Sequence, residues 1–197
     1  MRDMVKMVLV IAILSSFSGG LLAGIRIGTK DRIEIQQLEF VKGPAIRAIF
    51  EGFDNDPIAD RFKLTDNGSD VSFFVGIKNG TPQAVTFESF GKGFGGDIGV
   101  MVGVNIDNDS ILGVGVTTHS ETPGLGSKAK TEPGFRRQFA GLSINDSVNV
   151  KSMGGQIDAL SGATITSQGV CSAVSASGQM YQRLKKQIIE KVKSFKK

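Results

Sequence analysis

The sequence predicts an α+β protein, in which a single N-terminal transmembrane helix is followed by a mixed or antiparallel sheet with packing helices. Three observations predict this class. An uncharged apolar run covers residues 7–25. Short β-branched and aromatic segments between residues 71 and 118 are separated by turn residues, which is typical of neighbouring strands. From Ser167 onward, apolar residues recur every three or four positions, which indicates a helix with one buried face.

The composition excludes several classes of site. The chain has 197 residues, a net charge of +4, 40% hydrophobic residues and 21% charged residues, which suits one globular domain with an appendage. Because Cys171 and His119 are its only cysteine and histidine, the chain alone cannot build a zinc site of three or four ligands or an iron–sulfur cluster. Any redox chemistry must therefore come from an organic cofactor. The excess lysines lie in the last helical segment, where they suit a helix C-terminus better than a nucleic-acid surface.

The apolar run at residues 7–25 is bounded by Lys6 and Arg26. It approaches the roughly 20 apolar residues that a membrane-spanning helix needs. A cleaved signal peptide is the alternative, but no A-x-A site follows the run, and the run is long for such a peptide. We therefore expect an uncleaved anchor, preceded by a cytoplasmic segment of residues 1–6. Basic residues flank both ends, so the positive-inside rule does not decide the orientation.

Residues 26–52 are predicted as a helical connector, and residues 53–197 as the folded domain. Gly43-Pro44 interrupts the connector, so we expect one helix to about Val41, a break, and a short helix with Pro44 near its start. Residues 52–60 are polar and rich in turn formers, and they are predicted as a loop.

The domain begins with two predicted hairpins. The first joins strands at residues 71–78 and 84–87 through Asn79-Gly80, the strongest short hairpin signal. The second joins residues 98–106 to residues 111–118. Between the hairpins, glycines cluster around Phe94 in a loop suited to close backbone approach. A short helix at residues 135–139, a strand at residues 148–152 and the long final helix from Ser167 complete the prediction, with Cys171 as a small core residue.

The most informative stretch is the loop that precedes the final helix. It contains Ser161, Gly162, Ala163 and Thr164 in succession. Gly162 has no side chain to keep a phosphate away from the backbone, and the next helix would direct its N-terminal amides and positive dipole end at the anion. A plain N-cap, with no ligand, is the alternative interpretation of the same residues.

The order Asp158-x-x-Ser161-Gly162-Ala163-Thr164 resembles the covalent flavinylation signature of the FMN-binding domain family. The resemblance implies that a flavin transferase dependent on FAD and Mg²⁺ attaches FMN, through its phosphate, to the hydroxyl of Thr164. The resemblance also implies roles for the neighbours of Thr164. Asp158 would help the transferase, Ser161, Gly162 and Ala163 would shape the phosphate turn, and Thr166 would cap the helix or touch the phosphate.

The loop Glu121-Thr122-Pro123-Gly124-Leu125-Gly126 matches the second hallmark of the same family, in which this loop faces the flavin. Thr122 is a candidate to hydrogen-bond the ring edge, and Leu125 to pack on the ring face, whereas a simple turn is the alternative. Lys151 is a candidate ammonium near the flavin or its phosphate, and a surface lysine is its alternative. His119 is not assigned as a catalytic base, because a lone histidine is more often structural.

Over nearly its whole length the chain resembles the G subunit of the Rnf-type ion-translocating ferredoxin:NAD⁺ oxidoreductase. The related C subunit of the sodium-translocating NADH:quinone reductase is usually longer and is the alternative, as is a non-redox assembly subunit without flavin. The resemblance implies an electron-transfer subunit with covalent FMN and no complete active site of its own. It implies other membrane and peripheral subunits as partners, and a domain on the extracytoplasmic side of the cytoplasmic membrane.

Overall fold

A computed structural model describes residues 2–195, which divide into one unit that ends at Leu38 and another that begins at Glu39. The first unit contains the helix α1 (Arg2–Gln36). Its segment Arg2–Lys30 is long and apolar enough to cross a membrane, judged by length and composition. The predicted apolar helix at residues 7–25 is therefore confirmed, and it extends further in both directions.

The break predicted at Gly43-Pro44 is wrong. A π-helix (Gln37–Lys42) leads directly into α2 (Gly43–Ile49), with Pro44 in the first turn of α2. Proline has no amide hydrogen and its ring crowds the preceding turn. The first turn of a helix does not need that amide, and the wider π-helical turn comes directly before the proline, so the helical path continues.

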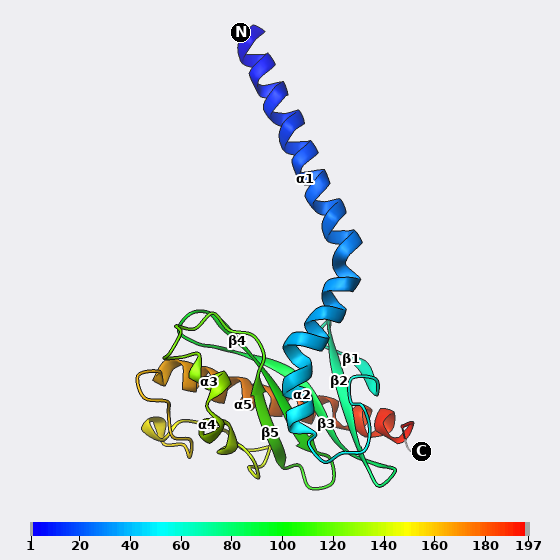
Figure 1. The fold of residues 1–197 in the computed structure, drawn as a ribbon, viewed down its shortest axis with the longest axis vertical. Coiled ribbons are helices and arrows are strands. Elements are labelled where there is room, and N and C mark those ends of the chain that lie inside the picture. Colours follow the sequence, from blue (N-terminus) through cyan, green and yellow to red (C-terminus); the bar gives the residue numbers. More distant parts are fainter. Residues whose placement is uncertain (1, 196–197) are drawn as a thin grey trace. The chain divides into compact units, whose positions relative to one another are not determined.

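Within residues 2–195 the strands form one five-stranded antiparallel sheet in sequence order, as Figure 1 shows. The strands are β1 (Arg61–Asp66), β2 (Ser69–Lys78), β3 (Thr81–Lys92), β4 (Asp97–Asn105) and β5 (Ile111–Val116). The hairpin at Asn79-Gly80 is confirmed, with φ angles of 53° and 70°. Strand β1 was not predicted, although its own hairpin turn, Asn67-Gly68, has the same signal, with φ angles of 49° and 80°.

Helices cover both faces of the sheet. The long helix α5 (Thr164–Lys193) packs on one face, where the rings of Phe87 and Tyr181 stack with centroids 6.4 Å apart. Side chains alternate along a strand, so Thr86 and its partner Gly103 face the other side, which α2 covers. A Cβ atom on Gly115 would lie 2.7 Å from that of Ala45, so glycine in the sheet lets α2 approach closely.

Short elements connect β5 to α5. They are α3 (Lys128–Thr131), which was not predicted, α4 (Pro133–Arg137), and a 3₁₀ helix (Lys151–Met153). The helix expected at residues 135–139 overlaps α4 but was placed two residues too late. The strand predicted at residues 148–152 is wrong. In this segment Val150 forms an isolated bridge to Ile157. No longer ladder follows, because the chain turns back within a few residues at Gly154, which has a φ of 78°.

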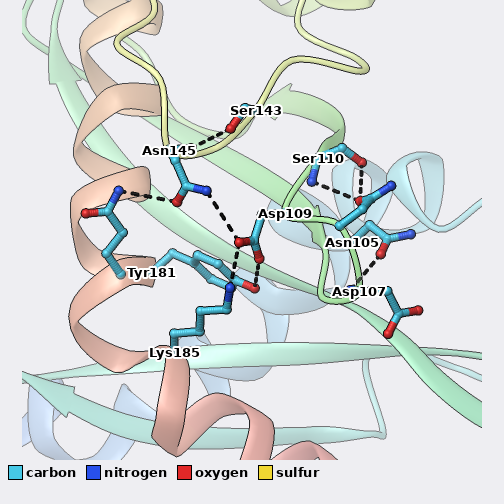
Figure 2. Close-up of polar contacts among 10 residues, drawn as sticks. Asn105, Asp107, Asp109, Ser110, Ser143, Asn145, Tyr181 and Lys185 are labelled. Atoms are coloured by element: carbon cyan, nitrogen blue, oxygen red, sulfur yellow. Dashed lines mark hydrogen bonds and ion pairs between the residues drawn. The ribbon is translucent and has the colours of Figure 1, made fainter.

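A polar cluster holds the β4–β5 turn against α5 (Figure 2). The carboxylate of Asp109 accepts hydrogen bonds from the Tyr181 hydroxyl at 3.0 Å, from Lys185 at 2.5 Å and from the Asn145 amide at 3.4 Å. Burial alone would raise the pKa of Asp109, but these three donors outweigh it and lower the pKa. The cluster therefore stabilises the register of α5 along the sheet.

Candidate functional site

The start of α5 meets the end of β3 through two glycines. A Cβ atom on Gly91 would collide with the carbonyl of Gly169, and one on Gly169 would lie 2.6 Å from the carbonyl of Lys92. Backbone therefore packs directly on backbone at this crossing. The consequence is that the first turn of α5 lies beside the loop of residues 93–96.

A cleft of about 460 Å³ is lined by three segments that are distant in sequence. They are Phe94 from the β3–β4 loop, residues 121–126 from the loop after β5, and residues 162–166 from the start of α5. Both stretches that the sequence singled out therefore share one cavity. A second hollow of about 390 Å³, between Asp70 and Phe90, contains none of the residues predicted for the site.

The loop before α5 is a tight turn closed by local hydrogen bonds. The amide of Ala163 donates to the carbonyl of Leu160 at 3.0 Å, and Gly162 has a φ of 73°, which favours glycine. The Ser167 hydroxyl accepts from the Leu160 amide at 2.9 Å and donates to the Ala163 carbonyl at 3.0 Å. These bonds fix where the helix begins.

The N-terminus of α5 is left open. Its N-cap residue is Ala163, and no side chain among the described residues caps the helix. Thr164 is the first helical residue and is exposed, so its hydroxyl lies at the edge of the cleft next to the free first-turn amides. Helix dipole and unpaired amides together make this position suitable for an anion such as a phosphate. Helix α5 begins at Thr164, three residues before the predicted start at Ser167.

Glu121 also lines this cleft and is only 6% exposed. Its carboxylate accepts a hydrogen bond from the Gly95 amide at 2.8 Å and a short one from the Thr166 hydroxyl. The Thr166 hydroxyl is therefore occupied by Glu121, although Thr166 is one of the residues that line the cleft.

Three exposed apolar side chains surround the cleft. Phe94 is 72% exposed, Leu125 46% and Ile165 51%. Large apolar residues that are exposed together mark a binding surface more often than isolated ones do. The sequence reasoning selected Leu125 but missed Phe94 and Ile165 as site residues. An aromatic residue isolated among glycines, as Phe94 is, was the available signal.

The structure brings most of the predicted site residues together. Those that line the cleft are Glu121, Thr122, Leu125, Gly126, Gly162, Ala163, Thr164 and Thr166. Ser161, Asp158 and Lys151 are not among the lining residues. Asp158 and Lys151 instead form an exposed ion pair with a nitrogen–oxygen distance of 2.8 Å.

The remaining soft side chains do not contribute to the cleft. Nδ1 of His119 accepts the Glu121 amide at 3.3 Å, which is a structural contact. Cys171 is fully buried, as expected of a core residue, and burial raises the pKa of its thiol to about 12. Among residues 2–195 no cluster of three or more His, Cys, Asp or Glu side chains could hold a metal ion.

Comparisons with known proteins agree with this geometry. A family model described as the FMN-binding domain matches residues 93–177, a range that contains every segment of the cleft. The G subunit of an ion-translocating oxidoreductase complex from Methanosarcina acetivorans is 30% identical over 177 residues, which cover 89% of this chain and 93% of that protein.

A second relative of the same name, from Cereibacter sphaeroides, is 37% identical over 142 residues. This match covers 69% of the chain but only 64% of that relative's length. Among solved structures, the C subunit of the Na⁺-translocating NADH-quinone reductase from Parabacteroides distasonis is similar, with a TM-score of 0.52 and 28% identity. That match covers 68% of this chain and 72% of the other.

Proposed function

Because the chain belongs to the family of G subunits of ion-translocating oxidoreductase complexes, we propose that it relays electrons within an Rnf-type complex through FMN attached to Thr164. The flavin supplies one- and two-electron redox chemistry when bound, whereas the protein supplies position and electrostatics. The chain is then an electron-transfer subunit of a larger oxidoreductase.

The single observation that carries the proposal is the open start of α5. Thr164 presents a hydroxyl at the end of a long helix whose first amides are uncapped, and both lie in a cleft shared with the second motif. A phosphoryl group on this hydroxyl would be stabilised by the helix dipole and by the first-turn amides. If the residues serve only to begin a helix, these amides would be satisfied by water instead.

The apolar side chains of the cleft suit a flat aromatic ring. Phe94, Leu125 and Ile165 offer apolar surface for ring faces, and the exposed Thr122 offers a hydroxyl for the ring edge. Such a cleft combines a position for an anion with apolar surface. FMN has the same two-part chemistry, so the residues present fit the cofactor.

The attachment of FMN to Thr164 is a phosphoryl transfer from FAD. The Thr164 oxygen attacks the phosphorus on the riboflavin side of the FAD pyrophosphate, and the P–O bond to AMP breaks. AMP leaves, the hydroxyl proton passes to a base of the transferase or to water, and no electrons are exchanged. Mg²⁺ belongs to the transferase. Asp158 and Lys151 are exposed, and we assign them to contacts with that enzyme rather than with the bound flavin.

The proposal includes a membrane location. The apolar part of α1 (Arg2–Lys30) would be an uncleaved anchor, and residues 53–197 would lie on the extracytoplasmic side beside other membrane and peripheral subunits. A covalent bond is useful there, because a cofactor released outside the cytoplasm would be lost by dilution.

The test is to express the full-length chain with a flavin transferase and to measure the mass of the peptide that contains Thr164. We expect the mass of one FMN moiety on the wild type and on the control Thr131→Ala, which removes an exposed threonine outside the cleft. Thr164→Ala should lose the added mass and the fluorescence of the denatured band. An unmodified wild-type peptide would contradict the proposal and favour a non-redox assembly subunit.

A further inference from the structure

Glu121 connects the three segments that form the cleft. Its backbone belongs to the loop after β5, one carboxylate oxygen accepts the Gly95 amide of the β3–β4 loop at 2.8 Å, and the other accepts the Thr166 hydroxyl of α5. We name this set of contacts the Glu121 clamp. Through it, a single side chain hydrogen-bonds to both other walls of the cleft.

Two glycines approach the Glu121 carboxylate closely. A Cβ atom on Gly126 would lie 2.5 Å from one carboxylate oxygen of Glu121, and a Cβ atom on Gly93 would collide with the other. Glycine at both positions therefore lets the backbone close around the carboxylate. A side chain enclosed in this way is held in place by close packing.

Glu121 is also absent from the ion pairs found within residues 2–195. No Lys, Arg or His side chain there forms an ion pair with Glu121, whose carboxylate is held by a backbone amide and a hydroxyl. Both contacts are donors to the carboxylate oxygens, which is the arrangement that an ionised carboxylate needs, because it can only accept hydrogen bonds. A negative charge beside a redox cofactor disfavours added electrons, since like charges repel at short range.

We propose that Glu121 is a positioning residue with an electrostatic effect, and that it does not itself contact the flavin. The clamp holds the first turn of α5, and with it the Thr164 hydroxyl, in fixed register with the Phe94 loop, while the Glu121 charge lowers the reduction potential of the site. The inference rests on the proposed function for its electrostatic part only.

Three variants separate geometry from charge. Glu121→Gln keeps an oxygen to accept the Gly95 amide and adds an amide that can donate to the Thr166 hydroxyl, so the clamp remains and the charge is lost. Thr166→Val keeps the charge and removes one arm of the clamp. Glu121→Ala removes both. The matched control is Glu190→Gln, which removes the same charge from an exposed position near the other end of α5.

The clamp is measured by hydrogen exchange of the Gly95 amide in full-length, flavin-free protein in detergent. Exchange should accelerate about tenfold in Glu121→Ala, the factor that corresponds to about 1.4 kcal/mol for one lost hydrogen bond. It should change little in Glu121→Gln. Unchanged protection in Glu121→Ala would overturn the clamp, and this outcome is readable even if the wild type carries no FMN.

The charge is measured by the midpoint potential of the FMN-loaded full-length chain. We expect a higher potential in Glu121→Gln, an unchanged one in Glu190→Gln, and a severalfold smaller fraction of modified Thr164 in Thr166→Val and Glu121→Ala. A purely structural role would leave the potential of Glu121→Gln at the wild-type value. That result would overturn the electrostatic part while the flavin itself still supports the proposed function.

Discussion

Replacing Asp109 with alanine should destabilise the domain more than any other change in the β4–β5 turn. Asp109 accepts hydrogen bonds from Tyr181, Lys185 and Asn145, which lie on α5 and on the loop after α4 (Figure 2). Its backbone has a φ of 57°, a conformation that aspartate and asparagine tolerate better than alanine.

The size of the effect follows from these contacts. The Tyr181 side chain is fully buried, so its hydroxyl would lose its acceptor at a cost of about 1–3 kcal/mol. Alanine at positive φ adds about 1 kcal/mol, and the partly exposed Lys185 pair adds about 0.5 kcal/mol. We expect about 3 kcal/mol for Asp109→Ala, and about 1 kcal/mol for Asp109→Asn, because asparagine keeps both the backbone conformation and an acceptor.

Urea unfolding of the full-length, flavin-free protein in detergent can measure this difference. Tyr181 is the only tyrosine and the chain has no tryptophan, so intrinsic fluorescence reports directly on the cluster. The control is Asp107→Ala in the same turn, where the side chain is exposed and a change within about 0.5 kcal/mol is expected. Equal free energies of unfolding for Asp109→Ala and Asp107→Ala would refute the reasoning.

The pH dependence provides a second check on the cluster. The pKa of Asp109 is lowered in the folded state, so its contribution is present above the ordinary aspartate pKa and is lost as the pH falls through the lower folded value. The difference in stability between wild type and Asp109→Asn should therefore be constant near neutral pH and shrink below about pH 4. A difference that grows on acidification would have the wrong sign.

Two further predictions concern the cleft and the core. Gly126→Ala would place a Cβ atom 2.5 and 2.7 Å from two oxygens of the Glu121 clamp, so we expect a severalfold smaller fraction of FMN-modified peptide by mass spectrometry. Gly134→Ala, whose nearest neighbour would lie 3.8 Å away, should behave as the wild type, and equal losses in both variants would contradict the reasoning. Cys171, with a pKa of about 12, should resist maleimide until the protein unfolds. The exposed position in Ser172→Cys should react at once. Rapid labelling of native Cys171 would be inconsistent with its burial.

The sequence predicted those parts of the fold that depend on local signals. The apolar run of α1, the Asn79-Gly80 turn and the periodicity of α5 each arise from neighbouring residues, and all three were confirmed. Strand β1 was missed because Arg61–Asp66 alternates charged and apolar residues at the edge of the sheet, where the hydrophobic signal is weak. The predicted strand at residues 148–152 was wrong because β-branched composition does not reveal whether a pairing partner is available.

The residues of the site were predicted from motifs, but the contacts among them were not predicted. Both motifs line one cleft, yet nothing in the local sequence shows that Gly91 and Gly169 allow α5 to lie directly on the end of β3. The burial of Glu121 and its bond to Thr166 likewise depend on a crossing of segments far apart in the chain. Pattern reasoning therefore identified the residues of the site but not which of them contact one another.

The start of α5 is informative because it departs from the usual rule for helices. Ser, Thr, Asp or Asn normally caps a helix N-terminus, and their replacement by alanine costs about 0.5–2 kcal/mol. Here Ala163 occupies the N-cap position although hydroxyl residues stand on either side of it, at Ser161 and Thr164.

The hydroxyl groups near this helix end have other partners. Ser167 tightens the preceding turn, and Thr166 binds Glu121, so these hydroxyls leave the first amides of the helix open. Departures of this kind are expected at functional positions, where a ligand completes what the chain leaves unpaired. A phosphoryl group on Thr164 would place an anion beside these open amides.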